Sequence, residues 1–361
     1  MITPVAINAP TQPSKVIRQT QTAETITEAV VPIVKLHETT NLTSLPVKLQ
    51  AHVENLCKIP RNTLNPAGMQ EAVDYIKNAW EAAGLGDRVE EQIFTTGYLG
   101  SEKQESKNII VSLGPKDAER IIIGAHYDTC AQGNPKLITN PGADDNASAV
   151  AGLLETGRAL KNIEQELYRK NLRVDLVAFA NEEPPYYHTE NMGSYVHARS
   201  LKEQNVKVRG MICYEMIGYY DDKANSQGYL DRAFGFHGGS LPWYLKPMNW
   251  LLKAIYPSTG NFLAVVGNWS SGSLAKQVTK GILDHGKIET KKISLPSKLL
   301  PMIEMSDQWS YWQHGFPAVM LTDTSFLRNP NYHKNTDTPN TLNYSKMTQV
   351  VEGVVGLVKG L

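Results

Sequence analysis

The sequence has few cysteines, no excess of charge and no long apolar run, and each shortage excludes a class of protein. Only three of the 361 residues are cysteines, Cys57, Cys130 and Cys213, and an odd number so far apart argues against a disulfide framework. The 36 Lys and Arg residues balance 36 Asp and Glu residues, which argues against a partner such as nucleic acid held by bulk charge. No run of about 18 apolar residues occurs, so we expect no membrane span.

What the sequence does contain is the composition of an ordinary globular protein, 41% hydrophobic and 20% charged. Residues 1–43 are rich in Thr, Gln, Pro and Ala without a sustained period, which predicts a tail or an extended surface segment. Their opening letters lack the basic start and apolar stretch of a signal peptide. We expect residues 44–361 to form a single domain, because the candidate chemistry spreads over most of that range.

The hydrophobic pattern predicts alternating helices and strands. Helices are expected over 45–59 and 65–84, the second with Asn65 as N-cap, Pro66 in its first turn and Gly84 as its stop. Strands are expected at 88–94, 108–113, 120–125, 172–181 and 208–218, helices at 146–161 and 192–204, and the alternation continues through 243–255, 273–278, 316–323 and 345–361. This pattern predicts an α/β fold, with a mixed, largely parallel central sheet sandwiched between helices in three αβα layers.

Polar side chains gather where the predicted strands end, and in open α/β sheets these ends share one rim. Carboxylates that converge there cannot all ionise without a compensating cation, so a multivalent metal is expected. Imidazole and carboxylate donors without thiolate favour zinc, and their number suits two metals bridged by one carboxylate. The candidate residues are His126, Asp128, Asp145, Glu182, Glu183, Glu215 and His333.

The motifs HYD, GADDNAS, NEE and YHKNTDTPN, with the acidic strand CYEMIG, resemble the M28 metallopeptidases, the co-catalytic zinc aminopeptidases, from about residue 45 onward. The resemblance implies that Glu182 is the general base for a water bridging two zinc ions. It also implies that Asp128 orients the His126 imidazole, and that the substrates are peptides with a free N-terminus. Asp145 would bridge the two zinc ions. The implied metal ligands are His126, Asp145, Glu183, Glu215 and His333.

Two positions depart from the family pattern. Glu215 stands where relatives commonly have Asp, and Gln308 stands where they often have His, so we expect Gln308 to ligate nothing. Two neighbours of the site have an ordinary structural explanation. Asp144 and Asn146 stand just before the predicted helix at 146–161, where we expect either to act as an N-cap.

Three alternatives to an aminopeptidase stay open at this point. A carboxypeptidase of the same family would need a cationic anchor for the substrate carboxylate, and Arg328 is the nearest candidate. A glutaminyl cyclase resembles this family but uses one zinc. A binding protein on a peptidase scaffold would have lost ligands or the base. Because the sequence keeps all five implied ligands and Glu182, we favour a zinc-dependent exopeptidase that removes N-terminal residues.

Overall fold

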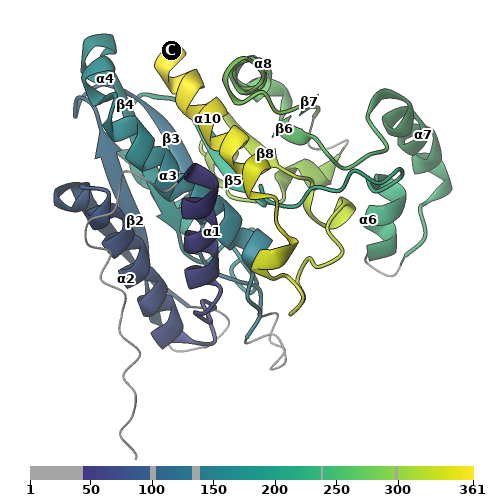
Figure 1. Ribbon diagram of the computed structural model, residues 1–361, viewed down its shortest axis with the longest axis horizontal. Coiled ribbons are helices and arrows are strands. Elements are labelled where there is room, and N and C mark those ends of the chain that lie inside the picture. Colours follow the sequence, from purple (N-terminus) through teal and green to yellow (C-terminus); the bar gives the residue numbers. More distant parts are fainter. Residues whose placement is uncertain (1–43, 98–102, 132–138, 237–238, 297–299) are drawn as a thin grey trace, which may run out of the picture. The chain divides into compact units, whose positions relative to one another are not determined.

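The protein folds around one eight-stranded sheet flanked by helices (Figure 1). The computed structural model describes residues 44–97, 103–131, 139–236, 239–296 and 300–361. The tail predicted at 1–43 lies outside these residues. Among the described residues, no helix is both long enough and apolar enough to cross a membrane.

The elements follow one another in α/β order. The strands are β1 (Val89–Thr96), β2 (Gln104–Leu113), β3 (Glu119–His126), β4 (Leu172–Phe179), β5 (Val208–Glu215), β6 (Leu263–Gly267), β7 (Thr290–Ser294) and β8 (Ala318–Thr322). The helices are α1 (Leu45–Leu56), α2 (Pro66–Ala82), α3 (Ala149–Lys161), α4 (Glu164–Lys170), α5 (Gly193–Glu203), α6 (Leu230–Phe236), α7 (Lys246–Ile255), α8 (Gly272–Gly281), α9 (Gln308–Gln313) and α10 (Tyr344–Gly360).

The sheet is mixed, with the order β1-β2-β4-β3-β5-β8-β6-β7. Its centre, β4-β3-β5-β8, is parallel, whereas β1-β2, β2-β4 and β8-β6 are antiparallel pairs. The expected α/β fold with a largely parallel centre is therefore confirmed. Because these four central strands run in the same direction, their carboxyl ends lie along one edge of the sheet.

The central strands are apolar without alternation because both faces of the sheet are covered. In β3, Ile121 and Ile123 join the core that packs under α1, α2, α3 and α10, while Ile122 joins the core beneath α5 and α9. On the first face α3 and α10 lie side by side across the strands (Figure 1). Such two-sided burial removes water from every position of a strand and explains the continuous apolar runs.

A buried ion cluster joins α1 to α3 on this face. Glu155 of α3 is 3% exposed, and its Oε1 lies 3.4 Å from Nε2 of His52 on α1. Its Oε2 accepts a 2.8 Å hydrogen bond from Nε of Arg158. Burial by itself would raise the pKa of Glu155, but His52 and Arg158 outweigh burial and lower the pKa to about 2. This carboxylate is therefore charged throughout the neutral range.

Several predicted boundaries hold, and two strands escaped the sequence analysis. The side chain of Asn65 caps α2 by accepting a hydrogen bond from Gly68 N at 3.1 Å, as predicted. The short strands β6 and β7 were not predicted. The lysines Lys291 and Lys292 lie on β7, which pairs only with β6 and forms an edge of the sheet. Lysines on an edge strand stay solvated and discourage pairing with other chains.

Candidate metal centre

Most of the candidate residues sit at the carboxyl edge of the four central strands. His126 is the last residue of β3, and Glu215 is the last residue of β5. Glu182 and Glu183 follow β4 after two connecting residues that turn the chain, and Asn181 there adopts a positive φ of 62°. His333 lies in the segment that follows β8. The parallel strands thus deliver their terminal side chains to one place, as the sequence analysis expected.

Asp145 lies between the two candidate histidines. Its Oδ1 is 3.5 Å from Nε2 of His126, and its Oδ2 is 3.1 Å from Nε2 of His333. The Asp145 side chain is buried, and both imidazoles are largely enclosed. Because each carboxylate oxygen faces a different histidine, this side chain has the geometry of a bridge between two positions.

Each of the two positions also has a carboxylate of its own. Oε2 of Glu215 lies 3.2 Å from Nε2 of His126, so the longer Glu side chain still reaches the cluster. Oε1 of Glu183 lies 3.4 Å from Nε2 of His333. Glu182 is placed differently, because its Oε2 is 3.8 Å from His126 and its carboxylate lines the adjoining pocket. The adjacent glutamates therefore point to different sides of the cluster.

Asp128 contacts the backbone of the two adjacent glutamates. Its carboxylate accepts the backbone N–H groups of Glu182 at 3.1 Å and Glu183 at 3.0 Å. The same side chain lies 3.6 Å from Nδ1 of His126, and that nitrogen is 3.1 Å from the Asp128 carbonyl oxygen. Asp128 therefore faces the ring nitrogen of His126 that points away from Asp145, and it also fixes the backbone of both glutamates.

Two further residues, which the sequence analysis did not single out, position the segments around Asp145. The Asp337 carboxylate accepts the backbone N–H groups of Asp144 and of Asp145, both at 3.0 Å. The fully buried Arg61 donates to the carbonyls of Tyr127 at 2.9 Å and of Gly142 at 2.8 Å. Both contacts are tertiary, and no local sequence pattern identifies them.

The expectation that Asp144 or Asn146 caps a helix is wrong. The backbone of Ala143–Ser148 is kinked, with non-helical angles at Asp145 and Asn146, and neither side chain caps α3. The Asp144 carboxylate instead accepts from Gly218 N at 3.0 Å and from Asn329 Nδ2 at 2.7 Å. Nδ2 of Asn146 donates to Oε2 of Glu215 at 3.2 Å. The side chains of Asp144 and Asn146 therefore bind residues distant in the sequence instead of the first turn of α3.

Glu215 has a second neighbour that the sequence analysis missed. The hydroxyl of Ser306 donates to Oε2 of Glu215 at 2.7 Å and so fixes the orientation of the carboxylate. Gln308, two residues later, donates to the Ile303 carbonyl at 2.9 Å and lies in neither of the candidate metal-binding groups among the described residues.

The enclosed carboxylates strongly perturb one another. Burial raises the pKa of Glu182 well above its ordinary range, with Glu183 and Glu215 adding to the rise against the opposing effect of His126. Burial also raises the pKa of Glu183 and of Glu215. Burial would lower the pKa of His126, but the Glu182 and Glu215 carboxylates outweigh it and raise that pKa. Without a cation, the cluster can be neutralised only by taking up protons.

The donor set fits divalent cations. Among the described residues, one group of His126, Asp145 and Glu215, and another of Cys130, Glu183 and His333, each bring ligand atoms within 4.8 Å of one another. Two buried atoms of these groups, Nε2 of His126 and Oε1 of Glu183, make no hydrogen bond to any described residue. A cation would satisfy both atoms and offset the carboxylate charge, as imidazole and carboxylate ligands do for zinc.

A pocket opens directly onto the cluster. Its polar end is formed by Asp145, Glu182, Glu183, Glu215 and His333. The rest of its lining is mainly apolar and includes Val266, Ile293, Leu300, Ile303, Met320 and Phe326. Arg328 does not line this pocket. It is 4% exposed and donates to Gln227 at 3.0 Å and to the Phe262 carbonyl at 3.0 Å.

Comparison with known proteins gives three kinds of likeness. Residues 108–241 match the description of peptidase family M28. The chain is 40% identical over 316 residues to the uncharacterized protein YfbL of Escherichia coli (strain K12), with 87% of each chain covered. It is 25% identical over 256 residues to leucine aminopeptidase 1 of Arthroderma otae, covering 70% of this chain and 57% of that protein. The chain thus spans little more than half the length of this second relative.

Solved structures resemble the fold at low identity. The LapA aminopeptidase of Legionella pneumophila has a TM-score of 0.60 at 17% identity, covering 86% of this chain and 70% of its own. The glutaminyl cyclase of Fimbriiglobus ruber has a TM-score of 0.58 at 18% identity, covering 88% of this chain and 96% of its own. At such identities the likeness shows the fold alone, and it is shared by a hydrolase and a cyclase.

Proposed function

Because the chain belongs to peptidase family M28, we propose that it is a two-metal aminopeptidase that removes N-terminal residues from peptides. The observation that carries the proposal is Asp145, whose two oxygens face two different histidines, His126 and His333. A cyclase that uses one metal has no need of a second histidine on the far side of this carboxylate. Zinc is the proposed metal, since the donors are mostly imidazole nitrogen and carboxylate oxygen.

In this proposal, His126 and Glu215 hold one ion, His333 and Glu183 hold the other, and Asp145 belongs to both. When bound, the ions would polarise the scissile carbonyl and lower the pKa of the attacking water. Asp128 would orient the His126 ring, and its carboxylate also accepts hydrogen bonds from the backbone of both glutamates.

Glu182 is proposed to move the proton. Its carboxylate lines the pocket, and its backbone is held by Asp128, which leaves its side chain free of the hydrogen bonds that fix Glu215. It would accept the proton of the attacking water and return that proton to the leaving amine. A carboxylate that takes up this proton and then returns it acts as general base and general acid in turn.

The pocket supports an N-terminal substrate with an apolar first residue. The carboxylates of Glu182 and Glu215 would attract the free α-ammonium group of the substrate. The apolar part of the pocket lining would contact the side chain of the first substrate residue. Arg328, the candidate anchor for a C-terminal carboxylate, is buried and makes its hydrogen bonds inside the protein. One methylene more or less in such a pocket is worth about 10- to 200-fold in kcat/KM.

The test uses zinc-loaded protein with leucine p-nitroanilide and its N-acetylated form. We expect cleavage of the free amine only, and slower cleavage of glutamyl and lysyl anilides. Glu182→Gln should lose roughly 10²- to 10⁴-fold in kcat, because the amide cannot take up the proton. Glu190→Gln is the matched control, since Glu190 lies nearby in sequence but its side chain is 75% exposed.

Three results would contradict the proposal. Equal cleavage of free and acetylated substrates would exclude recognition of the N-terminus. Release of C-terminal residues from peptides would indicate a carboxypeptidase. Cyclisation of N-terminal glutaminyl peptides without hydrolysis would indicate a glutaminyl cyclase.

A further inference from the structure

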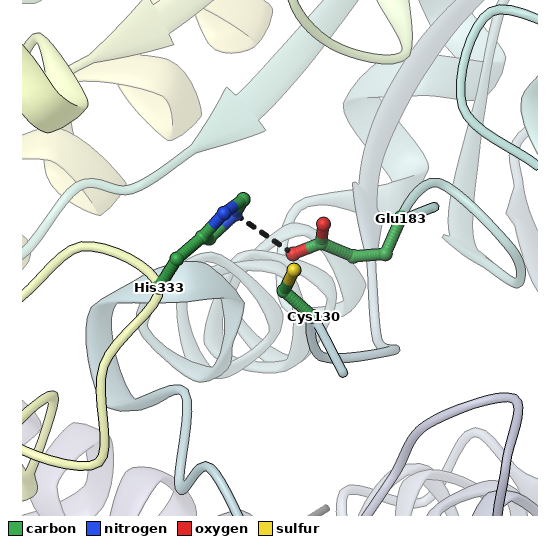
Figure 2. A group of neighbouring side chains, drawn as sticks. All are labelled: Cys130, Glu183 and His333. Atoms are coloured by element: carbon green, nitrogen blue, oxygen red, sulfur yellow. Dashed lines mark ion pairs between the residues drawn. The ribbon is translucent and has the colours of Figure 1, made fainter. Parts of the chain in front are cut away.

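Cys130 lies beside the candidate metal centre, although the sequence analysis assumed a site without sulfur. The residue follows β3 by four positions, and its side chain is 1% exposed. Its sulfur, a carboxylate oxygen of Glu183 and a ring nitrogen of His333 all lie within 4.8 Å of one another. Figure 2 shows the three side chains arriving from separate segments and meeting at their polar ends. This arrangement is compatible with three donors to one ion.

A second observation at the same place points to a ligand. Glu183 is 3% exposed, yet its Oε1 makes no hydrogen bond to any described residue. Its neighbour is Nε2 of His333 at 3.4 Å, an ion pair that is too long and poorly aligned for a hydrogen bond, and in Figure 2 the paired oxygen lies beside the Cys130 sulfur. A buried carboxylate oxygen without a hydrogen bond is costly, so a cation held among these three groups would satisfy it better than the imidazole alone.

Simple packing does not account for the surroundings of this thiol. A buried cysteine with a structural role behaves as a small apolar side chain among apolar neighbours. Cys130 instead faces a carboxylate and an imidazole. The thiol is also free, because no disulfide involves any of the three cysteines. A free thiol with such neighbours is available to bind a soft or borderline cation.

We propose that Cys130 is a metal ligand, so that the ion held by Glu183, His333 and Asp145 also binds sulfur. This inference rests on the metal centre of the proposed function. On binding, the S–H bond breaks, the proton passes to solvent, and the sulfur electron pair forms the bond to the ion. No oxidant or reductant is required.

The proposal makes the two metal positions chemically unequal. The position at His126 and Glu215 has only nitrogen and oxygen donors, whereas the position at His333 adds a thiolate. Thiolate favours zinc and cadmium over manganese or magnesium. The ion beside Cys130 is therefore the tightly held one, and the ion beside His126 is the one that exchanges.

The experiment reads the metal–sulfur bond directly. Metal-free protein is loaded with two equivalents of Co²⁺ for absorption spectroscopy, and with Zn²⁺ for X-ray absorption at the zinc edge. We expect a near-ultraviolet thiolate-to-cobalt band and a zinc–sulfur distance of about 2.3 Å. Both signals should disappear in Cys130→Ser and persist in Cys57→Ser and Cys213→Ala. The tightly held ion should bind at least about tenfold more weakly in Cys130→Ser, since a ligand matters no less than its supporting partners.

The outcomes separate this inference from the proposed function. Two bound metals and full peptidase activity without a sulfur signal would overturn the role of Cys130 and leave the function intact. A sulfur signal lost in Cys130→Ser, in a protein that hydrolyses no peptide, would support the ligand and contradict the peptidase. Failure of the wild-type protein to bind metal would overturn both. If Cys130→Ser does not fold, the wild-type spectra compared with the other two cysteine variants still decide the question.

Discussion

Replacing Arg61 by Met should destabilise the protein and loosen the candidate metal centre together. The guanidinium is fully buried and donates four hydrogen bonds, at 2.7 to 2.9 Å, all to backbone carbonyls. One acceptor, Leu56, ends α1; Tyr127 follows His126; and Pro141 and Gly142 precede the Asp145 segment. A single side chain thus ties both loops of the site to the first helix.

The expected loss can be worked out from these contacts. Two of the four carbonyls keep another donor, because Ile59 N also donates to Leu56 and Ala147 N to Gly142. Among the described residues, the carbonyls of Tyr127 and Pro141 have no other donor; leaving each unpaired costs about 1–3 kcal/mol, so together about 2–6 kcal/mol. Removing the guanidinium also relieves the desolvation of a buried charge, which offsets part of this loss. We therefore expect Arg61→Met to lower the free energy of unfolding by about 2–4 kcal/mol.

Urea unfolding of the metal-free protein, followed by tryptophan fluorescence, measures this loss, and titration with zinc measures the effect on the site. Arg61→Lys is the matched control. It keeps the charge, but a single ammonium group cannot reach four carbonyls in the fork geometry of arginine, so the loss should be intermediate. A loss below about 1 kcal/mol in Arg61→Met would refute the reasoning, as would a lysine variant as stable as the wild type.

Three further predictions concern charge and space. Zinc at 100 times its Kd should stabilise the wild type by about 2.7 kcal/mol in thermal unfolding and leave Asp145→Asn unchanged, and equal stabilisation of both would contradict the bridge. Since the folded pKa of Glu155 is about 2 against an ordinary 4.5, its charge should contribute about 3 kcal/mol above pH 4.5 and lose this contribution as pH falls towards 2. Glu155→Gln should therefore match the wild type in urea unfolding at acid pH and fall below it at pH 7. Gly193→Ala should cost about 1–3 kcal/mol, because its Cβ would lie 2.1 Å from Asn108 Oδ1, whereas Gly235→Ala, with nothing within 4 Å, should not destabilise.

The sequence was sufficient for the longer buried strands, but not for β6, which was missed although its five residues are all buried. The strands β3, β4 and β5 are buried on both faces, so their apolar runs were recognisable. The strand β7 was missed because its single neighbour, β6, leaves the lysines Lys291 and Lys292 solvated. The helix start near Asp144 was misjudged because the partners of that carboxylate lie 74 and 185 positions away. Local patterns cannot report contacts over such separations.

The same limit applies to the candidate site. Side chains that end strands were found from the sequence, since the direction of parallel strands brings them together. Apart from Asp128, which the family resemblance supplied, side chains that only orient them were missed, as with Ser306, which contacts Glu215 from 91 positions away. Cys130 was considered only as one of three cysteines that form no disulfide framework, because its closeness to His333 arises from the folding of two distant segments.

The hydrogen bonds from the backbone of Asp144 and Asp145 to Asp337 determine when, during synthesis of the chain, the site can form. The two ends of this contact are separated by 192 positions, and His333 lies just before the later one. A chain still being translated, or one terminated early, holds His126 and Asp145 without the residues that complete and brace them. Proteolytic activity of the proposed kind can therefore arise only after the segment that contains His333 and Asp337 has left the ribosome. Chains that end before this segment would lack the activity.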